Sequence, residues 1–184
     1  MRWVRAVPPM RIFEVRRHSH RDPLSEHLSE EGVALARRVA PALGPIDRVV
    51  SSRKVRAIET VEALGLSPDA IREALTRLPD EVEARVDEAA PRSFPDYLRM
   101  VESSDLVGPY AQRLATQWRE ELDALPDPGH LLAVSHGHLI ELGVAAALPA
   151  VARSGGRPLA PLEGVRLVDD GERWVRGEIL RIVR

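Results

Sequence analysis

Residues 11–23 place the strongest constraint on how this chain folds. They begin with an apolar run at residues 12–15, Ile-Phe-Glu-Val, which is typical of a buried strand, and they continue into Arg-Arg-His-Ser-His-Arg-Asp-Pro at residues 16–23. Cationic side chains and imidazoles are costly to bury in a core. At the carboxyl end of a strand in an α/β sheet, where ligands commonly bind, they can instead contact a ligand. The stretch therefore predicts an anion-binding site at the end of the first strand.

Two later apolar runs have the same form. Residues 46–51 lead into Ser-Arg-Lys-Val-Arg at residues 52–56, and residues 130–135 lead into His-Gly-His at residues 136–138. Helical apolar patterns follow the three strands, at residues 29–43, 52–65 and 139–148. This alternation of strands and helices predicts an α/β fold with a mainly parallel sheet and right-handed crossovers.

The remaining segments are less regular. Residues 67–107 are acidic and interrupted by prolines, so we expect short helices and a loop there, followed by a helix at residues 109–125. Residues 149–162 are rich in Pro and Gly and are expected to form a loop. A terminal hairpin is expected from residues 164–168 and 178–183. We expect residues 67–107 and 149–162 to form the lid and rim that select the substrate.

Length and composition narrow the class of protein. A chain of 184 residues fits one domain, and residues 1–9 are expected to form an arm in front of it. The net charge of −2 argues against general binding to nucleic acid or to a membrane surface. Without cysteine, disulfides and Cys-ligated metal sites are excluded. We find neither a membrane-spanning stretch nor a signal peptide, so a cytoplasmic location is expected.

The polar clusters after the three strands point to phosphate chemistry. The carboxyl ends of parallel strands lie along one edge, so the clusters are expected to meet in one cleft. Guanidinium groups match phosphate oxygens in pairs, and the N-termini of the following helices add N–H donors. Two histidines in such a site suggest that one attacks phosphorus while the other binds an oxygen. The attacking imidazole must be neutral, and its second nitrogen is expected to donate to a backbone carbonyl.

The ordered clusters resemble the histidine phosphatase superfamily, which has the phosphoglycerate mutase-like fold. The family has Arg-His-Gly after the first strand, extended in one branch to Arg-His-Gly-x-Arg-x-Pro, and residues 17–23 here read Arg-His-Ser-His-Arg-Asp-Pro. Residues 28–32, Leu-Ser-Glu-Glu-Gly, are similar to Leu-Thr-x-x-Gly, and residues 51–60 are similar to Ser-Ser-Pro-x-x-Arg-Ala-x-x-Thr. Residues 134–137 match Val-Ser-His-Gly. The resemblance covers residues 11–148 and implies a three-layer α/β/α sandwich.

The resemblance also implies the roles of individual residues. His18 becomes the nucleophile that carries the phosphoryl group, and Arg17, Arg56 and His136 form the phosphate pocket. Arg21 is implied as a further phosphate ligand. The resulting expectation is a metal-independent phosphoric monoester hydrolase that needs no cofactor and acts on a small phosphorylated metabolite or a phosphoprotein. A second copy of the chain is a further candidate partner.

The proton donor for the leaving group is less well defined. Many small family members place a glutamate some 25 residues after the arginine of the second block, which falls near Glu81 or Glu83 here. We favour Glu81, with the alternative that both are solvated charges in an acidic loop. The acid phosphatases use an aspartate directly after the second histidine, where this chain has Gly137. Ser19 is a second departure, because it replaces a glycine beside the phosphate.

Three other functions remain open from the sequence. The His-x-His pairs at residues 18–20 and 136–138, together with Asp22, suggest a metal-dependent hydrolase, although the neighbouring arginines disfavour a bound cation. A non-catalytic binder of phosphorylated ligands would keep the same pocket. Mutase activity is a further alternative, but the chain is short for retaining and reorienting a bisphosphate intermediate.

Overall fold

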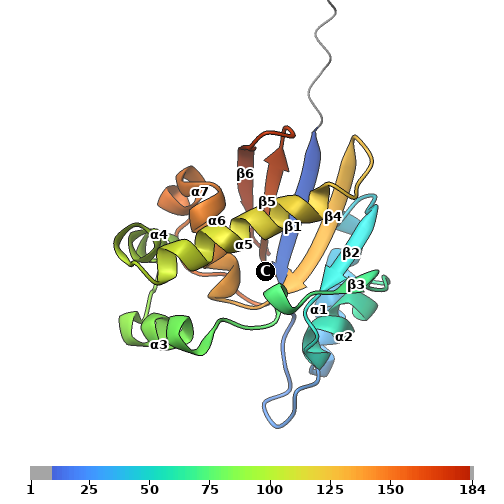
Figure 1. Ribbon diagram of the computed structural model, residues 1–184. Helices are drawn as coiled ribbons and strands as arrows, with labels where there is room; N and C mark the ends of the chain where they lie inside the picture. The colour runs from blue at the N-terminus through green and yellow to red at the C-terminus, as the bar shows by residue number, and fades with distance from the viewer. Residues whose placement is uncertain (1–9, 183–184) are drawn as a thin grey trace, which may run out of the picture.

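The computed structural model describes residues 10–182 and contains a six-stranded sheet with the order β3-β2-β4-β1-β5-β6 (Figure 1). The strands are β1 (Arg11–Arg17), β2 (Arg48–Ser51), β3 (Ala70–Ile71), β4 (Gly129–Ser135), β5 (Gly164–Asp169) and β6 (Trp174–Leu180). The pairs β1–β4, β4–β2 and β2–β3 are parallel, whereas β5 runs antiparallel to both β1 and β6. The expected mainly parallel sheet and terminal hairpin are both present.

Helices cover both faces of this sheet. Their bounds are α1 (Glu30–Val39), α2 (Val55–Ala63), α3 (Asp80–Ala89), α4 (Phe94–Ser103), α5 (Val107–Leu122), α6 (Leu139–Ala147) and α7 (Pro149–Ser154), with short 3₁₀ turns η1 (Ala40–Ala42) and η2 (Glu73–Leu75). Figure 1 shows α5 lying across one face of the sheet, and α1 and α2 pack on the other.

Strand β4 shows why the sheet needs two helical layers. Successive side chains of a strand point to opposite faces. Leu131 and Ala133 join the large core beneath α5 and α6, while Leu132 and Val134 join the two smaller clusters beneath α1 and α2. All four side chains are fully buried. A central strand that is apolar on both faces is stable only between two layers, which gives the three-layer α/β/α sandwich.

The irregular segments contain more regular structure than their sequence indicates. Residues 67–107 form the expected short helices as α3 and α4, but also contain the two-residue strand β3. The expectation of a loop throughout residues 149–162 is wrong at its start, where α7 forms with Pro149 in its first turn. Proline is well tolerated there because the first N–H of a helix needs no partner within it. The arm expected at residues 1–9 lies outside the described residues.

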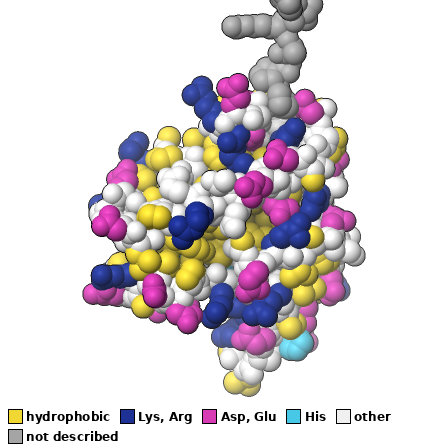
Figure 2. Space-filling model, in the orientation of Figure 1, with side chains coloured by type: hydrophobic (Ala, Val, Ile, Leu, Met, Phe, Trp, Pro, Cys, Tyr) yellow, Lys and Arg dark blue, Asp and Glu magenta, His cyan; other side chains and the backbone are white. Residues whose placement is uncertain are grey.

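The surface carries charges of both signs. In Figure 2, basic and acidic side chains are dispersed over the face that α5 crosses, and apolar side chains gather near its centre. Of the helices within residues 10–182, none has both the length and the apolar character that crossing a membrane requires.

The close packing of α5 on α6 gives a test of the fold. A Cβ added at Gly143 of α6 would overlap the benzo ring of Trp118 of α5. Alanine normally favours a helix over glycine, so propensity alone predicts that Gly143→Ala stabilises the protein. We expect the opposite, a loss of about 1–3 kcal/mol in the free energy of unfolding, because overpacking a core forces its neighbours to move. Urea denaturation followed by circular dichroism measures this change.

A second background separates steric overlap from other causes. The same Gly143→Ala change is made in a Trp118→Phe protein, which lacks the overlapping ring atoms. The destabilisation should shrink there, and an equal loss in both backgrounds contradicts the packing at this contact.

Candidate active site

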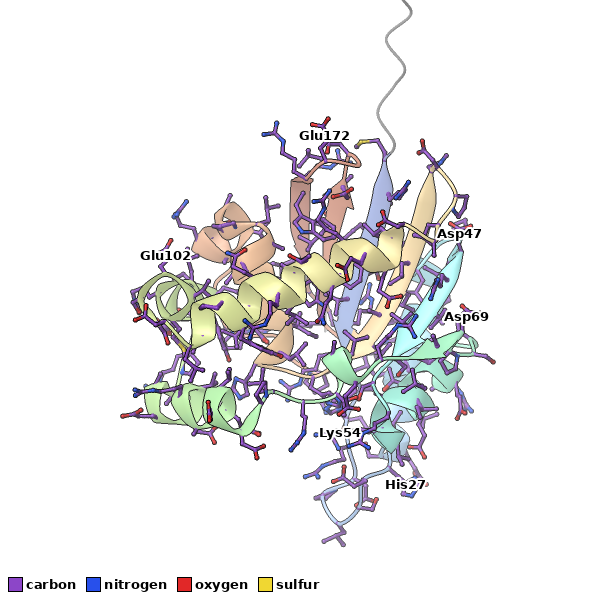
Figure 3. All side chains as sticks on the ribbon, viewed as in Figure 1. His27, Asp47, Lys54, Asp69, Glu102 and Glu172 are labelled. Carbon is purple, nitrogen blue, oxygen red and sulfur yellow. The ribbon has the colours of Figure 1, made fainter. Side chains whose placement is uncertain are left out.

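The three polar clusters meet at one cavity, at the carboxyl ends of β1, β2 and β4. Its volume is about 260 Å³. The lining residues come from all three clusters and from the segments that cover them: Arg17, His18, Lys54, Arg56, Thr76, Arg77, Leu78, Glu83, Tyr97, His136, Gly137, His138, Leu139, Glu141 and Pro158. Figure 3 shows Lys54 at this edge of the sheet, whereas Asp47 lies at the opposite end of the strands. The topology thus gathers residues that lie more than a hundred positions apart in the sequence.

His18 has one defined tautomer. Its backbone N–H donates to Ser135 O at 2.9 Å, which fixes the residue beside the end of β4. Its Nδ1 lies 2.7 Å from the carbonyl oxygen of Ser19, which can only accept, so Nδ1 carries the proton. The opposite nitrogen, Nε2, accepts a hydrogen bond from Arg56 Nε at 3.2 Å. The lone pair of Nε2 is therefore free of a proton and faces the guanidinium group.

The surroundings of His18 keep the imidazole neutral. Burial lowers the pKa of His18 to about 4, the bond to Ser19 O opposes this shift, and the charge of Arg56 reinforces it. A neutral imidazole at neutral pH is the form that can attack phosphorus.

His136 lies next to His18, with 5.1 Å between the ring centroids. Its Nε2 lies 2.8 Å from Ser52 Oγ, which already accepts the backbone N–H of Lys54. The Ser52 hydroxyl can donate to Nε2, and in that arrangement the imidazole proton lies on Nδ1. That Nδ1 is buried and has no partner among residues 10–182. Burial, together with the positive charges around the cavity, lowers the pKa of His136 to about 2.

Three cationic side chains face the two histidines. Arg17 donates from Nη1 to Leu159 O at 2.7 Å, while its Nε is buried and unpartnered in the described part of the chain. Arg56 also contacts the carboxylate of Glu26. Lys54 forms no ion pair within residues 10–182, and burial together with the charge of Arg56 lowers its pKa. Unpaired positive charge at a cavity with buried N–H donors is suited to an anion.

Ser19 points away from the cavity. Its hydroxyl is fully buried and donates to Gly32 O of α1 at 2.7 Å, and its backbone N–H donates to Thr60 Oγ1 of α2 at 3.0 Å. A Cβ on Gly32 would overlap the carbonyl of His20, so α1 lies directly against this loop. Serine in place of glycine therefore anchors the loop to both helices and leaves the cavity lining unchanged.

Two expected residues lie elsewhere. Arg21 does not line the cavity, and its Nη1 donates to Glu26 Oε1 at 2.9 Å. Glu81 is exposed on α3 and also lies outside the lining, which instead contains Glu83. Glu83, although exposed like Glu81, is the nearer of the two to the histidines, and the choice of Glu81 stays a prediction. A rough spacing in sequence does not determine which face of a short helix turns toward the sheet edge.

Four polar residues of the cavity lining were not found from the sequence, namely Thr76, Arg77, Tyr97 and Glu141. Tyr97 of α4 hydrogen-bonds through its hydroxyl to Nδ1 of His138, which has a left-handed backbone with a φ of 62°. Glu141 of α6 is fully buried, and burial raises its pKa. For Glu141 the sequence did hold one signal, because it is the only charged residue in the otherwise apolar stretch 139–148.

Of the four histidines in the His-x-His pairs, His18, His136 and His138 line the cavity and His20 does not. His20 lies 3.9 Å from Glu31, and His138 bonds to Tyr97. Across residues 10–182, no three His, Asp or Glu side chains are grouped so that they could hold a metal ion.

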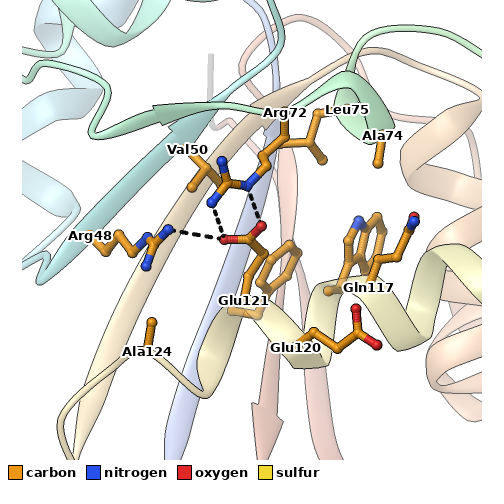
Figure 4. Close-up of a pocket in the computed structure, with 11 residues that line it drawn as sticks. Arg48, Val50, Arg72, Ala74, Leu75, Gln117, Glu120, Glu121 and Ala124 are labelled. Atoms are coloured by element: carbon orange, nitrogen blue, oxygen red, sulfur yellow. Dashed lines mark hydrogen bonds and ion pairs between the residues drawn. The ribbon is translucent and has the colours of Figure 1, made fainter.

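A second cavity lies beside α5 and has a volume of about 350 Å³ (Figure 4). Three of its four charged side chains form ion pairs, because Glu121 pairs with Arg72 and, at 3.3 Å, with Arg48. Its lining contains neither histidine nor hydroxyl group. Although it is larger than the cavity that contains His18 and His136, it offers no histidine or hydroxyl nucleophile.

Comparison with protein families and solved structures agrees with this geometry. The model of the histidine phosphatase superfamily (branch 1) matches residues 14–175. A phosphoserine phosphatase from Entamoeba histolytica, solved with 3-phosphoglyceric acid, has a TM-score of 0.67 at 15% identity, over 94% of this chain and 98% of that chain. A mycobacterial glucosyl-3-phosphoglycerate phosphatase solved with VO3 has a TM-score of 0.60 at 21% identity, over 94% of this chain and 98% of that chain.

A phosphoglycerate mutase from Bacillus anthracis has a TM-score of 0.60 at 19% identity, over 96% of this chain and 94% of that chain. These structures share the phosphoglycerate mutase-like fold. A comparison with curated proteins gives no significant match.

The charge state of His18 can be measured directly. We expect its imidazole to titrate near pH 4 and its Nε2 to stay unprotonated at neutral pH, because burial and Arg56 disfavour the cation. Nitrogen-15 NMR of labelled histidine gives both quantities, and a His18→Ala spectrum assigns the signals. His27 serves as an internal control, since its pKa is raised by the hydrogen bond to Glu59. A His18 that is protonated near pH 6.5, or that carries its proton on Nε2, disagrees with this geometry.

Proposed function

Because the chain belongs to the histidine phosphatase superfamily, we propose that it hydrolyses phosphomonoesters through a phosphohistidine on His18. The observation that carries the proposal is a neutral imidazole whose unprotonated Nε2 faces the cationic cavity. Phosphoryl transfer requires a nucleophile and positively charged or N–H donors for the phosphoryl oxygens. The cavity offers an imidazole nucleophile, two guanidinium groups and a second buried imidazole.

In the first step, His18 Nε2 attacks phosphorus. The N–P bond forms as the bond between phosphorus and the ester oxygen breaks, and the leaving oxygen takes up a proton. Positive charge develops on the imidazole, and its Nδ1–H is already bonded to Ser19 O at 2.7 Å, which stabilises that charge. Arg56 exchanges its hydrogen bond to Nε2 for one to a phosphoryl oxygen.

The other donors stabilise the transferring phosphoryl group. Arg17 and His136 line the cavity, and each carries a nitrogen without a partner within residues 10–182, so we propose that both side chains donate to phosphoryl oxygens. These donors are fixed before the reaction, and fixed donors in a water-poor site are the main source of transition-state stabilisation. The two histidines therefore differ in role because their free nitrogens differ, with a lone pair on His18 and an N–H on His136.

Glu83 is the proposed proton donor. It is the carboxyl group of α3 that lines the cavity, on the side of Lys54 and Arg77. It gives its proton to the leaving oxygen, and in the second step it accepts a proton from the water that attacks the phosphohistidine. The N–P bond then breaks, inorganic phosphate leaves, and His18 returns to the neutral form.

Arg21 remains a proposed phosphate ligand, provided that its contact with Glu26 can open. Glu26 contacts both Arg21 and Arg56, so its carboxylate holds the two guanidinium groups beside the cavity mouth. Arg21 reaches a phosphoryl oxygen only when this contact with Glu26 opens.

The first test is a screen of small phosphorylated metabolites and phosphopeptides for release of inorganic phosphate. Wild-type protein should act on at least one of them and keep its activity in EDTA. His18→Ala should lower kcat/KM by about 10³-fold or more, because the nucleophile is lost. Phosphate binding without turnover of any compound supports a non-catalytic binder instead. Isomerisation of a phosphoglycerate without phosphate release supports a mutase, and loss of activity in EDTA supports the metal-dependent reaction.

The second test compares the two glutamates of α3. Glu83→Gln should lower kcat about 10²–10⁴-fold on an alkyl phosphate, because an alkoxide needs a proton as it leaves. The effect should be much smaller on p-nitrophenyl phosphate, whose leaving group departs as an anion. Glu81→Gln is the matched control and should behave as wild type on both substrates. If Glu81→Gln shows the larger and leaving-group-dependent loss, Glu81 is the proton donor.

A further inference from the structure

Glu141 differs from the other buried acids of the molecule. Four acidic side chains are buried among residues 10–182, namely Glu14, Glu141, Glu163 and Asp169. Glu14 pairs with Arg16, Glu163 with Arg157, and Asp169 with Arg119. Glu141 is only 1% exposed and has no cation within ion-pair distance in the same part of the chain. Because a buried carboxylate without a cation is costly, Glu141 is expected to be neutral.

The contacts of Glu141 lead to the phosphate-binding arginine through one residue. Glu141 Oε1 accepts the backbone N–H of Leu159 at 2.9 Å. The carbonyl of the same Leu159 accepts Arg17 Nη1 at 2.7 Å. Leu159 is fully buried, so water does not replace either bond. The acid, the Leu159 backbone and the guanidinium therefore form a continuous chain from α6 to the end of β1.

Both ends of this series of hydrogen bonds belong to residues that line the same cavity. Glu141 Oε2 and Arg17 Nε are both buried without a partner among the described residues, and both side chains line the cavity. The other titratable or charged groups around Glu141 are Tyr97 on α4 and His138 before α6. Burial raises the pKa of Glu141, and the nearby charge of Arg17 only partly opposes this. An ionised Glu141 would attract the Arg17 guanidinium, which is the same group that the phosphoryl oxygens need.

We infer that Glu141 is a positioning residue for Arg17. As a neutral acid it fixes the Leu159 backbone, whose carbonyl holds the guanidinium in place, and it leaves the positive charge of Arg17 to the bound anion. The inference rests on the proposed function of this cavity. It also makes the site sensitive to alkaline pH, because ionisation of Glu141 places a negative charge beside the anion.

Sulfate binding by isothermal titration calorimetry tests this inference without requiring turnover. Sulfate keeps its two charges from about pH 6 to about pH 9.5, so any change in its affinity reports protein groups. We expect wild-type affinity to fall about tenfold or more across this range. Glu141→Gln, whose amide oxygen still accepts the Leu159 N–H, should bind within about threefold of wild type at pH 6 and should lose the alkaline fall. Glu141→Leu should bind about tenfold more weakly throughout, because the Leu159 N–H loses its acceptor.

Loss of the charge on Lys54 is the main alternative explanation for a fall in sulfate affinity at alkaline pH, because Lys54 also lines the cavity and has a lowered pKa. His18 and His136 are already neutral across this range, and burial raises the pKa of Tyr97 above it. Lys54→Arg, which stays charged, should keep the alkaline fall if Glu141 causes it. An unchanged fall in Glu141→Gln, or its disappearance in Lys54→Arg, overturns the inference.

Two further measurements separate the positioning role of Glu141 from unfolding of the variants and from failure of the proposed phosphatase function. Thermal unfolding of each variant shows whether it is folded at the temperature of the titration, and the nitrogen-15 signal of Arg17 Nε should shift in Glu141→Leu but not in Glu141→Gln. If sulfate binding behaves as expected while the metabolite screen finds no turnover, the proposed phosphatase function fails and the positioning role stands. If turnover is found and Glu141→Gln keeps the wild-type pH dependence, only the positioning role fails.

Discussion

The hydrogen bond between His18 Nδ1 and the Ser19 carbonyl fixes which nitrogen of the proposed nucleophile carries no proton, and Arg56 and the cavity lie beside that nitrogen. The carbonyl can only accept, so the proton stays on Nδ1 and the lone pair of Nε2 faces Arg56. Burial removes the alternative of protonating both nitrogens. The cavity thus combines strong positive charge with an unprotonated imidazole, and the neighbouring cations themselves favour the neutral form of His18.

The fold supplies the rigidity that this arrangement needs. His18 is held by its backbone bond to Ser135, and Ser19 is bonded to both α1 and α2. The Ser135 hydroxyl in turn donates to Leu75 O at 2.7 Å, which fixes η2 close to the cavity. The loop after β1 is therefore hydrogen-bonded to β4 and to α1 and α2, the two helices on the face of the sheet opposite α5. Such multiple anchoring holds catalytic groups within the narrow range that phosphoryl transfer tolerates.

The sequence predicted the parts of this structure that depend on local patterns. The run at residues 12–15 and the polar cluster after it identify both a strand and its carboxyl end, and three such runs identify the meeting point of the site. It did not predict that Glu83, and not Glu81, belongs to the cavity lining, because a rough spacing does not give the rotation of α3. It also could not show that Glu26 holds Arg21 outside the cavity, because this depends on the path of an exposed loop.

Glu141 illustrates the same limit for charge. In sequence it is an acid in a helix, and only the structure shows that it is completely buried without a cationic partner, which raises its pKa. Ser19 shows the converse, since a departure from the family pattern at the nucleophile has no effect on the cavity once its side chain is seen to face α1. Tertiary contacts, and not residue type, assign the roles in both cases.

The most direct measurement for the central claim is the position of the phosphoryl group in a trapped intermediate. Protein mixed with a turned-over substrate is quenched in alkali, digested and analysed by mass spectrometry and phosphorus-31 NMR, which distinguish the two phosphohistidine isomers. The account predicts an acid-labile phosphoryl group on Nε2 of His18, because Nδ1 is committed to the Ser19 carbonyl. Phosphorylation at Nδ1, at His136, or at no histidine in a protein that releases phosphate would contradict it.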